Sequence, residues 1–184
     1  MDMGAAQEGE TVLVIGGGVI GLMAVQLAKL AGAKVLLMTR SPEKQTLGLN
    51  IGADYAVGTE SEVRAIWPEG ADLVVECAGV SATVTLSHKL ARSGGRVVIL
   101  GVISQGEQVP IEPFDMLFRE IQMHFSFLNP FTHERAAKMI ADGTINVSPL
   151  ISRTISLEEA ALAISSPPPK GEVRAIVVPN HDRN

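Results

Sequence analysis

Hydrophobic residues in this chain occur in short runs, separated by longer segments in which apolar and polar positions are mixed. Short runs rich in valine, isoleucine and leucine are typical of strands that are buried on both faces of a parallel sheet. Such runs predict strands at 12–15, 34–38, 55–57, 72–76, 96–100, 121–127 and 173–178. The segments between them predict helices at 19–31, 42–50, 81–91, 113–119, 132–141 and 157–164.

Predicted strands and helices alternate, with short connections, as far as about residue 127. This alternation is typical of an α/β protein whose parallel sheet carries helices on both faces. We therefore predict a doubly wound Rossmann sheet of six strands in the order 3-2-1-4-5-6, with the ligand across the carboxyl ends of the strands. The expected divisions are a loose N-terminal segment at 1–10, a dinucleotide-binding domain at 11–165, and a C-terminal strand and tail at 166–184.

A glycine motif follows the first predicted strand and opens the first predicted helix. Gly16, Gly18 and Gly21 fit the spacing G-x-G-x-x-G, with Val19 and Ile20 between the last two glycines. In this context the glycines allow a tight turn, close approach of a pyrophosphate, and close contact between helix and strand. The helix N-terminus offers unpaired N–H groups to the anion. The motif predicts a dinucleotide site, and the alternative is a glycine-rich turn without a ligand.

The residues after the second predicted strand bear on the choice of cofactor. An acidic residue about 20 positions after the glycines holds the ribose 2′-hydroxyl of NAD. Here this position reads Thr39-Arg40-Ser41, and the first acid is Glu43, which the start of the next helix is expected to turn away. Arg40 pairs well with a phosphate, and Lys44 lies one helical turn further on. We therefore predict NADP(H) over NAD(H), the alternative being that both cations are ordinary surface residues.

Composition limits the other classes of function. The 184 residues carry a net charge of −5, which disfavours a nucleic-acid partner because no basic stripe is available to neutralise phosphates. One cysteine fits a reducing cytoplasmic location. The stretch Thr11–Ala28 has no charge, but its internal glycines and Gln26 favour a buried strand and helix over a membrane span.

No group of metal ligands is predicted. A catalytic zinc needs three protein ligands from Cys, His, Asp or Glu. Cys77 follows a buried strand and is interpreted as a small core residue, and Glu76 as a structural hydrogen-bonding group rather than a base. The histidines show no H-x-x-x-H spacing and are interpreted as surface or capping residues: His88, His124, His133 and His181. We predict neither catalytic nor metal-binding residues in this chain.

Several motifs in the same order resemble the cofactor-binding domain of the medium-chain dehydrogenase/reductase family. The resemblance is greatest to zinc-type polyol (sorbitol and iditol) and threonine dehydrogenases, and covers residues 9–179. Phe125 and Leu128 depart from it, since a glycine and often an arginine are usual at these positions. The motifs are Val12–Gly21, Gly52-Ala53-Asp54, Glu76-Cys77-Ala78-Gly79, Gly94–Val98, Phe127–Ala136 and Leu150–Arg153.

The resemblance implies roles for individual residues. Thr39 stands where NAD-using members keep an aspartate, and Arg40-Ser41 resembles the NADP-using variants. The pyrophosphate would be bound by Gly16, Gly18, Gly21 and Arg174. The adenine ribose and the nicotinamide would be contacted by Cys77, Ala78, Gly79, Leu100, Gly101, Val102, Ser126 and Phe127.

The resemblance also implies an activity and partners. The chain is expected to be the NADP(H)-binding part of an alcohol or polyol dehydrogenase, with the catalytic zinc on an N-terminal domain that this chain lacks. We expect the chain alone to be inactive and to form a homodimer through the edge strand 121–127. Two alternatives remain: a stand-alone nucleotide-binding or redox-sensing module, and a zinc-independent quinone or enoyl reductase of the same family.

Overall fold

The structure is a computed structural model that describes residues 2–128 and 131–179. Its elements follow the chain as β1 (Thr11–Ile15), α1 (Val19–Leu30), β2 (Lys34–Met38), α2 (Pro42–Asn50), β3 (Tyr55–Val57), α3 (Glu60–Ile66), β4 (Ala71–Glu76), α4 (Ser81–Leu90), β5 (Ala91–Ile99), α5 (Pro113–Phe118), β6 (Gln122–Phe125), α6 (His133–Ala141), the 3-10 helix η1 (Ser148–Leu150), β7 (Ile151–Ile155), α7 (Leu157–Ser165) and β8 (Arg174–Val177). Six parallel strands form one sheet in the order β3-β2-β1-β4-β5-β6. The predicted Rossmann fold and strand order are confirmed.

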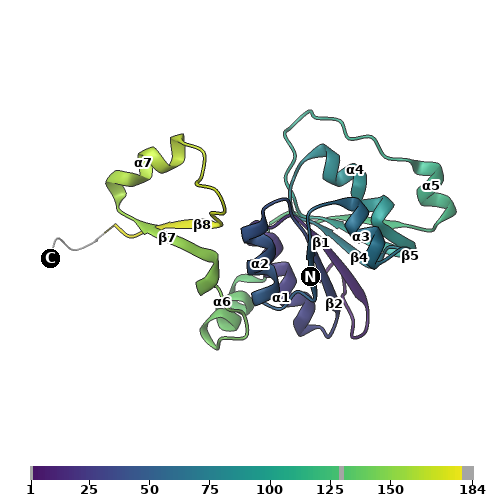
Figure 1. The fold of residues 1–184 in the computed structure, drawn as a ribbon, viewed down its shortest axis with the longest axis horizontal. Coiled ribbons are helices and arrows are strands. Elements are labelled where there is room, and N and C mark those ends of the chain that lie inside the picture. Colours follow the sequence, from purple (N-terminus) through teal and green to yellow (C-terminus); the bar gives the residue numbers. More distant parts are fainter. Residues whose placement is uncertain (1, 129–130, 180–184) are drawn as a thin grey trace.

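The strands are apolar along their whole length because both faces of the sheet are covered. In β1, Val12 and Val14 point into a core cluster on the side of α1, whereas Leu13 and Ile15 point into a second cluster. All four side chains are at most 1% exposed. Helices α1 and α2 cover the first face, and α3 and α4 cover the other (Figure 1). A run without polar alternation is what two-sided burial requires.

Helix α3 was not predicted from the hydrophobic pattern. It is only seven residues long, and Val63 is its one buried side chain among the described residues. A capping box marks its start: the Thr59 hydroxyl accepts from the amide of Glu62, and the Glu62 carboxylate accepts from the amide of Thr59. The local signal for this helix was therefore the cap, not the periodicity of apolar residues.

The C-terminal part differs in two ways from the predicted elements. Strand β6 covers Gln122–Phe125 and not the whole of 121–127, and β7 was not predicted. β7 pairs in parallel with β8 in a second sheet, and with α7 this β7–β8 lobe stands apart from the six-stranded sheet (Figure 1). This lobe joins residues on both sides of the expected boundary at 165, and that boundary stays a prediction.

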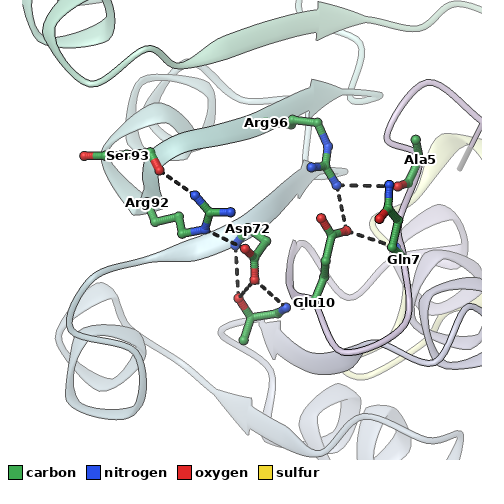
Figure 2. A network of polar contacts seen from close by, with 8 residues as sticks. Ala5, Gln7, Glu10, Asp72, Arg92, Ser93 and Arg96 are labelled. Carbon is green, nitrogen blue, oxygen red and sulfur yellow. Dashed lines mark hydrogen bonds and ion pairs between the residues drawn. The ribbon is translucent and has the colours of Figure 1, made fainter.

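A polar network fixes the amino-terminal side of the sheet and the segment that leads into it. Figure 2 shows Arg96 on β5 donating to the Glu10 carboxylate over 2.7 Å, and the amide of Gln7 donating to the same carboxylate over 2.9 Å. The Arg96 guanidinium also donates to the carbonyl of Gly4 over 3.0 Å. The described part of the segment expected to be loose is therefore hydrogen-bonded to the sheet.

Asp72 joins three elements in this network (Figure 2). Its carboxylate accepts from the amide and the hydroxyl of Thr11 over 2.8 and 2.7 Å, and from Arg92 over 2.5 Å. Burial acts to raise the pKa of Asp72, but the Thr11 hydrogen bonds and Arg92 outweigh burial and hold this pKa below its usual value. The ionised carboxylate therefore stabilises the folded state.

We expect Asp72→Asn to lower the free energy of unfolding at pH 7 by about 1 kcal/mol. Because the pKa of Asp72 is lowered by folding, its contribution is present above about pH 4 and is lost as the pH falls. The difference between the two proteins should therefore shrink between pH 5 and pH 3 when urea unfolding is measured, using Glu69→Gln, at an exposed carboxylate, as the control. A constant difference across this range would contradict the assignment.

Candidate functional site

The carboxyl ends of the strands meet along one edge of the sheet. Ile15 pairs in register with Met38 and Glu76, Glu76 with Ile99, and Ile99 with Phe125. Each residue that directly follows a strand extends the backbone pairing of the sheet by one more hydrogen bond. Their amides donate to the neighbouring strand over 2.8–3.0 Å: Gly16 to Met38, Thr39 to Val57, Cys77 to Ile15, Leu100 to Glu76 and Ser126 to Ile99. Five predicted site segments are thus brought together at the edge where Rossmann folds bind their ligands.

The glycine loop has the geometry that its sequence predicts. Gly16 has φ +108°, and a Cβ there would lie 2.8 Å from the amide nitrogen of Ala78. A Cβ on Gly21 would overlap the carbonyl oxygen of Gly16, so helix α1 approaches the turn too closely for a side chain. Gly18 is different, because no atom lies within 4 Å of a Cβ built there. This open space beside Gly18 leaves room for a ligand.

The N-terminus of α1 is suited to an anion. Gly18 is the N-cap and provides no side-chain cap, and the first turn contains no acidic residue. Val19 and Ile20 follow, and Ile20 is 53% exposed. The amides of this turn and the helix dipole therefore face the carboxyl edge of the sheet without a competing carboxylate of their own helix.

The residues predicted to read the ribose lie beside the glycine loop. A Cβ on Gly17 would lie 2.8 Å from Thr39 Oγ1 and 3.1 Å from Lys44 Cβ, so the loop packs against both side chains. Arg40 is exposed and Lys44 is half-buried. In the chain as described, residues 2–128 and 131–179, neither cation forms an ion pair. Thr39 and Lys44 thus contact the glycine loop, and Arg40, next to Thr39 in the chain, is an exposed cation without an ion pair in the described structure.

Glu43, the first acid after the second strand, contacts two other side chains. The Ser41 hydroxyl, which caps α2 by accepting from the amide of Lys44, donates to Glu43 Oε2 over 2.7 Å. Glu43 Oε1 lies 3.2 Å from the Lys170 ammonium of the loop before β8. The Ser41 hydrogen bond is the main reason that the pKa of Glu43 falls to about 2. The start of α2 therefore holds this carboxylate in contact with Ser41, and the expectation that it points away from the ribose stays a prediction.

Glu76, the last residue of β4, lies at the centre of this edge and binds the backbone that follows it. Its side chain is fully buried, and Oε1 accepts from the amides of Ala78 and Gly79 over 2.8 and 3.0 Å and from Thr83 Oγ1 over 2.7 Å. Its other oxygen has no partner in the described structure and lies against Gly101, where a Cβ would overlap it. This is the structural hydrogen-bonding role predicted for Glu76, but Thr83 was not predicted as its partner.

Two backbone segments lie in contact across this centre. Gly79 has φ +67°, and a Cβ there would lie 2.8 Å from the carbonyl oxygen of Val102. The predicted ribose segment, Cys77 to Gly79, and the predicted nicotinamide segment, Leu100 to Val102, therefore form one layer beside the glycine loop. Burial and then Glu76 raise the pKa of the Cys77 thiol to about 12, so the thiol is neutral and unreactive at pH 7.

A cavity of about 800 Å³ lies next to the predicted nicotinamide side. Leu100, Ser126 and Phe127 form part of its wall, together with apolar residues of α1 and α6. The one cation among the described residues of its wall, Arg135, is paired with Asp2, so this mostly apolar cavity differs in character from the glycine-loop edge. Phe125 and Phe127 remain 68% and 74% exposed at the edge strand and directly after it.

Arg174 lies outside the six-stranded sheet, as the first residue of β8. The preceding Val173 packs against the core cluster of the α1 face, which keeps the start of β8 close to the larger sheet. No hydrogen bond or ion pair within the described residues joins Arg174 to the glycine loop. Its predicted contact with the pyrophosphate stays a prediction.

The histidines are distributed over separate elements. His88 on α4 is fully buried, which corrects its interpretation as a surface or capping residue, and both its ring nitrogens lack partners in the described structure. Burial and then Lys89 lower the pKa of His88, so its ring is neutral at pH 7. His124 lies in β6, His133 opens α6, and His181 lies outside the described residues.

Among residues 2–128 and 131–179, no three His, Cys, Asp or Glu side chains gather in a way that could hold a metal ion. In the same residues, no helix is both long enough and apolar enough to cross a membrane.

The chain is similar in sequence to known dehydrogenases. Among curated relatives, mouse sorbitol dehydrogenase is 29% identical over 172 residues, covering 89% of this chain and 48% of the relative. L-arabinitol 4-dehydrogenase of Hypocrea jecorina is 26% identical over 191 residues, covering 96% and 50%. The chain therefore spans about half the length of the curated relatives that it matches.

Solved structures show the same relationship. A Sinorhizobium meliloti protein, crystallised with bound NADP, is 50% identical with a TM-score of 0.93, covering 97% of this chain and 55% of that one. A Thermus alcohol dehydrogenase is 29% identical with a TM-score of 0.87, covering 96% and 54%. The sequence profile of the zinc-binding dehydrogenases matches residues 19–142. The chain thus belongs to the zinc-binding dehydrogenase family, as a cofactor-binding domain of the medium-chain dehydrogenase/reductase type.

Proposed function

We propose that this chain binds NADP(H) as the cofactor-binding part of a zinc-type alcohol or polyol dehydrogenase. The observation that supports this most is the packing of the glycine loop against Thr39 and Lys44, beside the exposed Arg40. This is the position at which NAD-binding folds keep an acid for the ribose. The cofactor present in the Sinorhizobium meliloti crystal structure supports the same choice.

Each part of the edge has a proposed task. The glycine loop and the α1 N-terminus bind the pyrophosphate, together with Arg174, while Thr39, Arg40, Ser41 and Lys44 bind the 2′-phosphate. The layer formed by 77–79 and 100–102, with Ser126 and Phe127, orients the nicotinamide. When bound, the cofactor supplies hydride transfer with a secondary alcohol, and the zinc that polarises the alcohol oxygen would belong to a domain outside residues 1–184.

Cofactor choice can be measured directly by calorimetry. We expect NADPH to bind at least about tenfold more tightly than NADH, which corresponds to about 1.4 kcal/mol. Arg40→Ala should remove most of this preference and leave the affinity for NADH nearly unchanged, because only the phosphate loses its partner. Equal or tighter binding of NADH by the unmodified protein would refute the proposed preference.

We also propose that the chain forms a homodimer through β6. This strand lies at the edge of the sheet and pairs with β5 alone within the described structure. Phe125 and Phe127 are largely exposed there, and open edges with apolar side chains are normally covered in folded proteins. A two-fold pairing of edge strands is a common way to close such an assembly.

Light scattering at micromolar concentration tests the homodimer. We expect about twice the chain mass of 19.5 kDa, and the monomer mass after Phe125 and Phe127 are both replaced by lysine. Since both side chains are already exposed, the double variant should keep its fold, which circular dichroism can check. A monomer in the unmodified protein rules out the dimer, and a dimer that survives the replacement places the interface elsewhere.

A further inference from the structure

Glu43 links the proposed phosphate subsite to the β7–β8 lobe. Its Oε2 accepts from the Ser41 hydroxyl, and its Oε1 faces the Lys170 ammonium at 3.2 Å. Gly171 packs on the same side chain, since a Cβ there would lie 3.2 Å from Glu43 Cβ and Cγ. One carboxylate thus touches the cap of α2 and a loop that lies far away in the sequence.

This arrangement conflicts with simple binding of a phosphate at Ser41. The Ser41 hydroxyl has one proton, which it donates to Glu43, and its oxygen already accepts from the amide of Lys44. A 2′-phosphate would have to take over this proton while lying next to a carboxylate of the same sign. Glu43 therefore opposes the phosphate both as a competing acceptor and as a charge.

We propose that Lys170 sets the affinity of this subsite for a 2′-phosphate by balancing the charge of Glu43, an inference that rests on the proposed NADP(H) function. Lys170 is here a positioning residue: it holds Glu43 Oε1, so that the Ser41 proton can turn to the phosphate without leaving Glu43 unpaired. The β7–β8 lobe thereby acts on cofactor discrimination at the end of β2.

The surrounding charges make this effect measurable. Arg40 and Lys44 supply the two other cations beside Ser41, and Glu43 is the acid in contact with its hydroxyl. The Lys170 side chain is 84% exposed, so its ion pair contributes little to stability and can be removed without unfolding the protein. Charges at such short range still change the binding of a doubly charged anion, most strongly at low salt.

The test compares adenosine 2′,5′-bisphosphate with adenosine 5′-monophosphate by calorimetry at low salt. The four proteins are the unmodified chain, Lys170→Met, Glu43→Gln and the double variant. We expect Lys170→Met to weaken binding of the bisphosphate about fivefold and Glu43→Gln to strengthen it about fivefold, with the monophosphate unchanged. The double variant should bind like Glu43→Gln, because Lys170 has no charge left to balance.

Lys89→Met is the matched control, because Lys89 forms a similar exposed ion pair with Glu112 over 2.6 Å at the opposite face of the sheet. It should leave both affinities unchanged. If Lys170→Met weakens bisphosphate binding equally with and without Glu43, Lys170 acts on the phosphate itself and the inference is wrong. It is also wrong if Lys170→Met has no effect in a protein that prefers the bisphosphate. If the unmodified chain binds both nucleotides equally, the proposed cofactor preference fails instead, and this inference falls with it.

Discussion

Gly21→Ala should lower the free energy of unfolding by about 2–3 kcal/mol and reduce the affinity for NADPH more than tenfold. A methyl group at this position would overlap the carbonyl oxygen of Gly16, which is backbone and cannot rotate away. Helix α1 must therefore move from β1, and the turn that is proposed to hold the pyrophosphate moves with it. Urea unfolding and calorimetry measure the two effects.

Gly18→Ala is the control that separates ligand binding from folding. Gly18 has φ −79°, and no atom lies within 4 Å of a Cβ built there, so the variant should be as stable as the unmodified protein. Its methyl group would nevertheless occupy the open space in which we place the pyrophosphate, and NADPH affinity should fall at least tenfold. Unchanged affinity in a stable Gly18→Ala protein would place the pyrophosphate elsewhere.

Glu76→Ala should lower the free energy of unfolding by about 3 kcal/mol. The substitution removes the acceptor of three hydrogen bonds, so the amides of Ala78 and Gly79 lose their buried partner and the Thr83 hydroxyl keeps only the carbonyl of Val80. Because these residues support the layer between the glycine loop and Gly101, NADPH binding should also weaken. Urea unfolding and calorimetry again provide the measurements.

Glu76→Gln tests whether the hydrogen bonds or the charge carry this effect. Glutamine keeps an oxygen that can accept the same three bonds, and the unpartnered Oε2 is the atom that changes to an amide. We expect less than half the loss seen for Glu76→Ala. An equal loss in both variants would mean that the charge of Glu76, rather than its role as acceptor, holds this layer together.

The sequence predicts the six-stranded sheet because strands that are buried on both faces are continuous runs of apolar residues. Runs such as Val12–Ile15 have no polar position, and each residue enters one of two cores. The hydrophobic pattern of helix α3 is weaker, since Val63 is its one buried residue in the described structure. Strand β7 is mostly exposed, and Ile155 is its one buried residue. Its sequence therefore contains no apolar run that would predict a strand.

The site was predictable to the extent that it is local. The glycine loop and the segment Thr39–Lys44 are each continuous in sequence, and the strand order alone places them at one edge. The contact between Glu43 and Lys170 joins positions far apart in the chain, and neither residue type is unusual on a surface. Such a pair is visible only after folding, and the sequence analysis did not predict it.

We propose above all that a dinucleotide lies across the carboxyl ends of the strands. Amide chemical shifts recorded by NMR during titration with NADP test this directly, residue by residue. We expect the largest shift changes at residues 16–21, 39–44, 77–79 and 100–102. Little change is expected around Thr11, Asp72 and Arg96, toward the amino ends of the strands (Figure 2). Changes confined to that polar network, or to the α6 wall of the large cavity, would contradict the account.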